Sequence, residues 1–90
     1  MTLQEIIIDI HTLNDDLEAY ERKYGVLSET FYESYSNGEE PEDDSWVLDW
    51  ADWAGAYKIL LRRKDQYRRA ISSFHPRVEK TGQAERISRK

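Results

Sequence analysis

Apolar side chains recur every three or four residues along most of this chain, and no other pattern narrows its fold as far. In the first segment the spacings are 3, 4, 3, 4, 3 and 4, through Leu3, Ile6, Ile10, Leu13, Leu17, Tyr20 and Tyr24. The same spacing returns later, with one polar member, through Trp46, Trp50, Trp53, Tyr57, Leu60, Lys64, Tyr67, Ile71 and Phe74. Because such positions share one face of an α-helix, the sequence predicts two long amphipathic helices.

Capping signals predict where the first long helix begins and ends. Thr2 followed three residues later by Glu5 is a capping-box pattern, in which each side chain accepts a hydrogen bond from the other's backbone. Gly25 follows the last turn, and glycine readily adopts the left-handed conformation that ends many helices. A short helix is expected over residues 28–35, with Ser28 as its cap.

The second long helix is expected to follow an acidic loop. Asn37-Gly38 ends the short helix, and residues 39–44 have the composition of a loop. The long helix is then expected to begin at Asp43, Asp44 or Ser45 and to run to about Phe74, because Pro76 blocks its continuation. Residues 76–90 contain few large apolar side chains, which predicts a flexible basic tail.

These elements predict an all-α fold. Residues 1–75 are expected to form one domain, an antiparallel two-helix hairpin that is coiled-coil-like and has a short connecting helix, with residues 76–90 as the basic tail. At the helical rise per residue, the first helix would be roughly 33 Å long and the second roughly 45 Å. Part of the longer apolar face would then lack a partner in its own chain, which predicts a homo-oligomer or a stable complex with another protein.

Charge is distributed unevenly along the 90 residues, whose net charge is −5. Residues 24–57 contain nine acidic residues and no Lys or Arg, whereas residues 58–90 contain eleven basic residues and three acidic ones. Such polarity is typical of a contact with another macromolecule, and equally of pairing within one chain or between two copies. Charge alone does not choose between these interpretations.

Several kinds of site lack the residues they need. There is no cysteine, and the two histidines, His11 and His75, are not part of a nucleophile–base or metal-ligand pattern. The four glycines form no phosphate-binding loop, and the apolar run Ile6-Ile7-Ile8 is far shorter than the roughly 20 residues of a membrane span. We therefore expect a cytoplasmic protein that is not an enzyme, with no cofactor, metal, small-molecule substrate or membrane contact.

One long stretch of the chain resembles a known class of proteins. It contains the turn Lys23-Tyr24-Gly25, the segment Ser28-Glu29-Thr30-Phe31-Tyr32, the pair Gly38-Glu39, and the segment Asp49-Trp50-Ala51-Asp52-Trp53. In this order, over about residues 3–70, these residues resemble small helical antitoxin-like proteins, with the Asp-Trp pairs in place of a usual Glu-Trp. The resemblance implies the antitoxin of a two-gene, type II toxin–antitoxin pair, whose cognate protein toxin is commonly a small basic ribonuclease.

The charge pattern and the resemblance lead to one hypothesis of mechanism. An acidic belt would cover the cationic RNA-binding surface of the toxin, by steric and electrostatic masking. Aromatic side chains beside the acids would add buried area, although core packing is the default interpretation of aromatics at helical spacing. The expected partner-binding residues are Glu29, Tyr32, Glu33, Tyr35, Glu39, Glu40, Glu42, Asp43, Asp44, Asp49, Asp52 and Tyr67.

Two alternatives stay open at this point. The first is a nucleic-acid-binding regulator that contacts DNA through the basic C-terminal half, with Arg62, Arg63, Arg68, Arg69, Arg77, Lys80, Arg86, Arg89 and Lys90. Against it stand the net negative charge and the lack of a helix-turn-helix pattern. The second is a self-assembling helical structural protein, in which the charges pair within and between copies.

Overall fold

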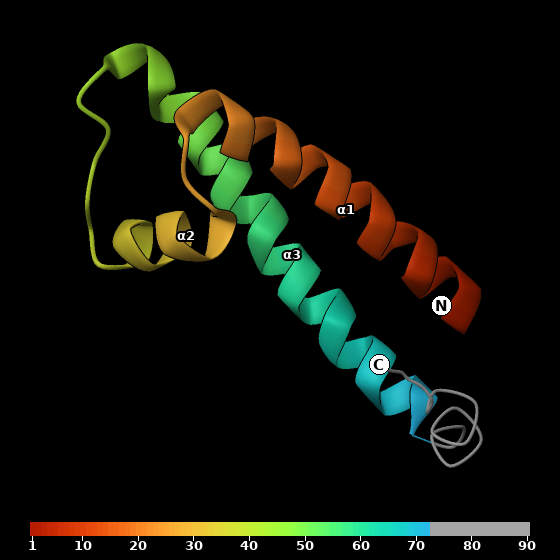
Figure 1. Cartoon of the computed structure of the whole chain (residues 1–90). Coiled ribbons are helices and arrows are strands. Elements are labelled where there is room, and N and C mark those ends of the chain that lie inside the picture. The colour runs from red at the N-terminus through yellow and green to blue at the C-terminus, as the bar shows by residue number, and fades with distance from the viewer. Residues whose placement is uncertain (73–90) are drawn as a thin grey trace, which may run out of the picture.

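A computed structural model of the chain describes residues 1–72, and these residues are helical apart from their connections. The elements are α1 (Leu3–Tyr24), α2 (Ser28–Ser36), the single-turn 3₁₀ helix η1 (Asp44–Trp46) and α3 (Val47–Ile71), arranged as in Figure 1. None of the described helices is long and apolar enough to cross a membrane. The predicted all-α class is confirmed for residues 1–72, whereas the predicted helix end near Phe74 and the basic tail lie outside the described residues.

The predicted ends of α1 are confirmed by its hydrogen bonds. The Thr2 hydroxyl accepts a hydrogen bond from the Glu5 N–H at 3.1 Å, and the Glu5 carboxylate accepts one from the Thr2 N–H at 2.8 Å. These bonds also lower the pKa of Glu5. Gly25 has a φ of +77° and donates its N–H to the Glu21 carbonyl at 2.8 Å. Local capping chemistry therefore fixes both ends of this helix.

α1 and α3 pack against each other and run in opposite directions (Figure 1). Lys23 pairs with Asp49 near one end of the two helices, and Asp9 pairs with Arg63 near the other. In both helices the predicted seam positions within residues 1–72 are buried or half-buried, with the exception of Lys64, which is exposed. The described part of α3 exceeds α1 by only three residues, so the expected long overhang is not seen within residues 1–72.

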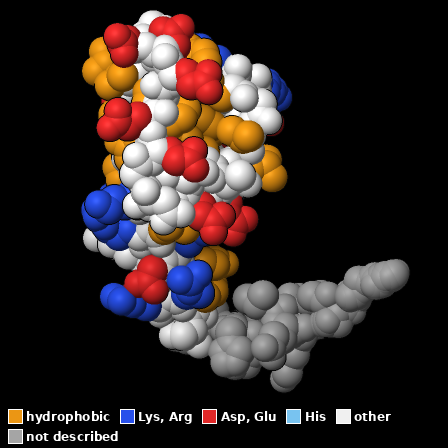
Figure 2. Space-filling view, turned by 90° about the vertical axis from the view of Figure 1, so that its left-hand side faces the viewer, with side chains coloured by type: hydrophobic (Ala, Val, Ile, Leu, Met, Phe, Trp, Pro, Cys, Tyr) orange, Lys and Arg blue, Asp and Glu red, His pale blue; other side chains and the backbone are white. Residues whose placement is uncertain are grey.

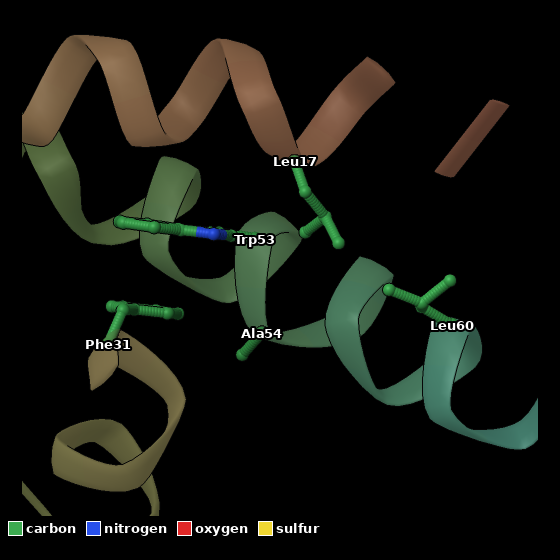
Figure 3. Packing of buried hydrophobic residues seen from close by; sticks show 5 residues of the cluster. All are labelled: Leu17, Phe31, Trp53, Ala54 and Leu60. Atoms are coloured by element: carbon green, nitrogen blue, oxygen red, sulfur yellow. The ribbon is translucent and has the colours of Figure 1, made fainter. Parts of the chain in front are cut away.

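α2 lies beside the end of the helical pair where α1 ends and α3 begins (Figure 1). The indole of Trp53 is fully buried there, and the Phe31 ring stacks on it at a centroid distance of 3.8 Å. Tyr20 and Tyr24 also stack on this indole, at 5.7 and 5.6 Å. The core in Figure 3 comprises Leu17, Phe31, Trp53, Ala54 and Leu60. Core packing is thus the role of this tryptophan.

The prediction that Ser28 caps α2 is wrong. Leu27 occupies the cap position without a side-chain cap bond, and Ser28 is a buried residue of the first turn. Its N–H and hydroxyl donate to the Glu21 carboxylate at 2.9 and 2.7 Å, and its oxygen accepts the Trp53 indole N–H at 2.9 Å. Because α2 packs directly on Trp53, this hydroxyl lies between α1 and α3 and links all three helices.

Candidate protein-binding surface

The structure separates the nine acids of residues 24–57, which we call the acidic belt, into two groups. Seven are exposed and have no ion pair within residues 1–72: Glu29, Glu33, Glu39, Glu40, Glu42, Asp44 and Asp52. Figure 2 views the molecule from the α2 side, where most Asp and Glu side chains lie in the upper half and most Lys and Arg side chains in the lower half. The belt therefore gives one half of the molecule an open negative surface.

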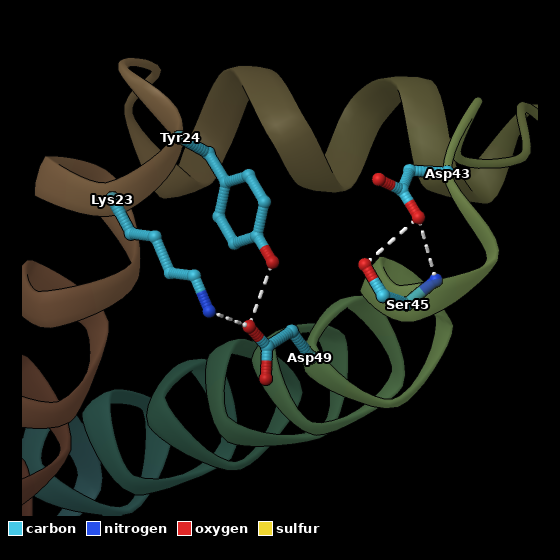
Figure 4. Close-up of polar contacts among 5 residues, drawn as sticks. All are labelled: Lys23, Tyr24, Asp43, Ser45 and Asp49. Atoms are coloured by element: carbon cyan, nitrogen blue, oxygen red, sulfur yellow. Dashed lines mark hydrogen bonds and ion pairs between the residues drawn. The ribbon is translucent and has the colours of Figure 1, made fainter.

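The two remaining acids of the belt, Asp43 and Asp49, are engaged within the chain (Figure 4). The Asp49 carboxylate accepts hydrogen bonds from Lys23 Nζ at 2.6 Å and from Tyr24 Oη at 2.7 Å. These bonds hold the pKa of Asp49 below its usual value. Asp43 accepts from the Ser45 N–H and hydroxyl, both at 2.8 Å, and the backbone bond lowers the pKa of Asp43 most. Both carboxylates thus stabilise the start of α3.

Two exposed apolar side chains lie at the start of α3, next to the loop acids in the sequence. Leu48 is 77% exposed and Val47 is 48% exposed, and neither belongs to the buried seam of the helix. Val26 and Leu27, in the connection between α1 and α2, are also exposed. Sequence reasoning missed these residues because it followed the seam. The available signal was an adjacent apolar pair, Val47-Leu48, at positions where a helix facing solvent would carry polar residues.

The three predicted partner-binding tyrosines do not form one surface. Tyr32 and Tyr35 are half-buried and pack against the core, with the Tyr32 ring 5.1 Å from that of Tyr57 and the Tyr35 ring 5.5 Å from that of Phe31. Tyr67 is also half-buried, but it lies at the other half of the helical pair, in a hollow with Ile7 and Ile10. Contacts within the chain therefore bury much of the surface of Tyr32 and Tyr35.

Three of the four predicted nucleic-acid contacts within residues 1–72 form ion pairs. The Arg63 guanidinium contacts the Asp9 carboxylate at 3.0 Å, and Arg68 and Arg69 both contact Asp65, at 3.6 and 2.8 Å. Arg62 is exposed and has no ion pair within residues 1–72. The other predicted nucleic-acid contacts lie outside the described residues: Arg77, Lys80, Arg86, Arg89 and Lys90. DNA contact therefore stays a prediction. Fewer of the predicted basic residues on α3 lack an ion pair than the sequence indicated.

Neither a metal centre nor a known relative defines this surface further. No group of three or more His, Asp or Glu side chains within residues 1–72 is placed to hold a metal ion. Comparison with protein-family models, curated proteins and solved structures found no match to the chain. The open acids and their apolar neighbours are therefore the features on which a functional proposal can rest.

Proposed function

We propose that this chain is an antitoxin-like interaction protein that binds a small basic cognate toxin and neutralises it by masking the toxin's cationic surface. The observation that carries the proposal is the set of seven exposed, unpaired acids on one half of residues 1–72. Complementary fields accelerate the encounter of two proteins and oppose the binding of a competing polyanion such as RNA. Covering the cationic surface would thus exclude the toxin's substrate.

Within the belt, we assign the main contact to the loop acids Glu39, Glu40 and Glu42. All three are exposed, and they lead along the chain to Val47 and Leu48 at the start of α3. Charge contributes mainly to the rate of association, whereas burying apolar side chains slows release. The loop carboxylates would therefore speed association, and the exposed leucine would slow dissociation.

Asp43 and Asp49 act indirectly in this proposal. Their carboxylates already accept two hydrogen bonds each within the chain, so they are less available to a partner than the loop acids. They support the position of the loop and of the first turn of α3. The proposal also includes the coiled-coil-like hairpin as a rigid support, the basic tail over residues 76–90, a cytoplasmic location and a role without catalysis or cofactor.

The first test is co-expression with the reading frame adjacent to the gene of this chain. We expect the product of that frame to arrest bacterial growth when expressed alone and to be harmless together with this chain. We also expect the two proteins to purify as a stoichiometric complex. A neighbour that is harmless alone, or that stays toxic and unbound in the presence of this chain, would contradict the proposal.

The second test separates local masking from net charge. The double variant Glu40→Lys/Glu42→Lys should weaken the complex by about a hundredfold, since two carboxylates at the contact are reversed. Its matched control is Asp15→Lys/Asp16→Lys, which changes the net charge equally on the exposed part of α1. The control should slow association slightly at low salt and leave the dissociation rate unchanged. Equal loss of affinity in both variants would exclude masking by the loop.

A further inference from the structure

Asn37 and Gly38 form the turn that ends α2. Asn37 directly follows the last helical residue, and Gly38 has a φ of +94°, in the left-handed region that glycine adopts without strain. The Gly38 N–H donates to the Tyr35 carbonyl and the Glu39 N–H to the Ser34 carbonyl, both at 3.1 Å. This pair of bonds is a Schellman motif, and the motif explains why a glycine follows this asparagine.

The Asn37-Gly38 pair is open to solvent and chemically labile. Asn37 is exposed, and its side chain makes no hydrogen bond within residues 1–72. A Cβ at Gly38 would meet no atom within 4 Å, so the surroundings of the glycine are open as well. Asparagine is a thermally labile residue, because the backbone nitrogen of the next residue can attack its side-chain carbonyl carbon. Glycine has no side chain to obstruct that attack.

The folded cap holds this pair in an unreactive conformation. Asn37 has a ψ of 3°, which places the Gly38 nitrogen beside the backbone nitrogen of Asn37 and away from its side chain. The attacking nitrogen must also lose the proton that it donates to the Tyr35 carbonyl. Ring closure therefore requires rotation about the Asn37 Cα–C bond and opening of the cap. Helix ends open more readily than buried segments, so the last turn of α2 gives access to the reactive conformation.

We propose that Asn37 is a site of spontaneous deamidation whose rate is controlled by opening of the α2 cap. The Gly38 nitrogen loses its proton to a base from solvent and bonds to Asn37 Cγ. The bond from Cγ to the side-chain nitrogen then breaks, and this nitrogen takes a proton from solvent and leaves as ammonia. Water opens the resulting succinimide at either carbonyl, which gives aspartate or isoaspartate at position 37. No oxidant or reductant takes part, and the chain gains one negative charge at neutral pH.

The products of this reaction weaken the end of α2. A carboxylate at position 37 lies at the negative end of the helix, where anions are unfavourable. Isoaspartate also routes the backbone through an extra methylene, so the hydrogen bonds of Gly38 and Glu39 lose their register. Because α2 holds the Phe31 ring on the Trp53 indole, loosening of α2 lowers the stability of the fold. This inference involves no partner and is therefore independent of the proposed function.

Peptide mapping by mass spectrometry, on the complete chain incubated at mildly alkaline pH, tests the proposal. We expect Asn37 to react about tenfold more slowly than in a synthetic peptide of residues 34–41, because only the open cap reacts. The Gly38 amide should be protected from hydrogen exchange by the same factor, since one opening exposes both groups. Asn14 is the internal control: it is also exposed, but Asp15 follows it in the middle of α1, and it should stay unchanged.

Substitutions separate the chemistry from the control by the cap. Asn37→Gln should stop the reaction at this position, because its longer side chain disfavours ring closure. Asn37→Asp reproduces the aspartate product and should melt at a lower temperature than the wild type. Phe31→Leu removes the ring that stacks on Trp53 and should accelerate the reaction at Asn37. Its matched control is Tyr67→Leu at the other half of the helical pair, which should leave the rate unchanged.

Several results would overturn the proposal. An Asn37 that stays intact in the chain unfolded by urea would remove the modification site itself. Equal rates in the folded chain and in the peptide would exclude control by the cap, and so would equal acceleration by Phe31→Leu and Tyr67→Leu. Circular dichroism checks that both leucine variants keep their helices. If Phe31→Leu unfolds, the comparison with Gly38 amide exchange in the wild type decides the question.

Discussion

At the end of the molecule that carries α2, the Phe31 ring and two tyrosine rings stack on the Trp53 indole. At the opposite end, α1 and α3 meet across Ile7, Ile10 and Tyr67, and no third element of residues 1–72 covers the hollow between them. The first end is closed by its own chain. The second is left uncovered by the described part of the chain.

The polar contacts of the two ends differ in the same way. Near α2, Ser28 joins Glu21 to the Trp53 indole, and Asp49 accepts hydrogen bonds from two side chains of α1. At the opposite end, one ion pair, Arg63 with Asp9, crosses between the helices within residues 1–72. Of these bonds, the one from the Trp53 indole to Ser28 is buried, and breaking it would leave unsatisfied groups, whereas the Lys23–Asp49 and Arg63–Asp9 pairs are partly exposed and more readily replaced by water.

The largest difference between the ends should appear on truncating their aromatic side chains. Trp53→Ala removes the fully buried indole and should cost about 3–5 kcal/mol of unfolding free energy, enough to leave a domain of this size largely unfolded. Tyr67→Ala, at the half-buried position of the other end, should cost about 1 kcal/mol. Urea denaturation followed by circular dichroism measures both. Similar losses of unfolding free energy at the two positions would contradict the idea that only the α2 end is closed by its own chain.

The next largest effect is expected from the Ser28 hydroxyl. Ser28→Ala leaves the buried Trp53 indole N–H without its acceptor and removes a donor to Glu21, which should cost about 1–3 kcal/mol. Ser34→Ala, on the same short helix, is the control and should change stability by less than about 0.5 kcal/mol. Thermal unfolding of the two variants compares them directly. Equal melting temperatures for Ser28→Ala and Ser34→Ala would mean that the Ser28 hydroxyl does not join the helices.

Acid should weaken the α2 end through Asp49. The hydrogen bonds from Lys23 and Tyr24 lower the pKa of Asp49 in the folded chain. A carboxyl with a lowered folded pKa stabilises the fold above its unfolded pKa, and this stability is lost as the pH falls through the folded pKa. The unfolding free energy of the wild type should therefore fall between about pH 5 and pH 2.

The variant Asp49→Asn isolates that carboxylate. It should be less stable than the wild type at neutral pH, and its stability should fall less steeply on acidification. Asp52→Asn removes an exposed carboxylate of the same helix that has no ion pair within residues 1–72, and serves as the control. Urea titrations at a series of pH values give the slopes. Equal slopes for Asp49→Asn and the wild type would remove Asp49 from the acid response.

The smallest effect is expected from the ion pair between Arg63 and Asp9 at the opposite end. Arg63→Met keeps an apolar stem and removes the charge, and it should cost less than about 1 kcal/mol because both partners of the pair are partly exposed. A double-mutant cycle with Asp9→Asn gives the interaction energy itself. A coupling energy larger than that between the Ser28 hydroxyl and Trp53 would mean that this end is held as specifically as the α2 end.

Features encoded locally could be predicted from the sequence. Thr2 with Glu5, and Gly25, define the ends of α1 because their hydrogen bonds join residues three or four positions apart. The seam spacing identified the buried faces of both long helices. Lys64, the one polar member of the seams, is their one exposed member within residues 1–72. The pairs of Arg68 and Arg69 with Asp65 also follow helical spacing and were open to prediction.

Features that depend on the position of α2 could not be predicted in this way. Phe31 stacks on Trp53 across a long loop, and no local period specifies that contact. Because of this position of α2, Ser28 is a buried hydrogen-bonding residue between helices and not the predicted cap, and Tyr32 packs against the core. The division of the acidic belt likewise depends on Lys23 and Tyr24 reaching Asp49 from another helix. The spacing of apolar residues identifies the buried face of a helix, whereas the residues that this face contacts are determined by tertiary packing.

Amide hydrogen exchange of the complete chain tests the contrast between the two ends most directly. In dilute protein, amides around Trp53 should already be strongly protected, whereas those around Ile10 and Tyr67 should exchange faster. Equal protection at both ends would contradict a molecule whose own chain closes the α2 end and leaves the end around Ile10 and Tyr67 uncovered.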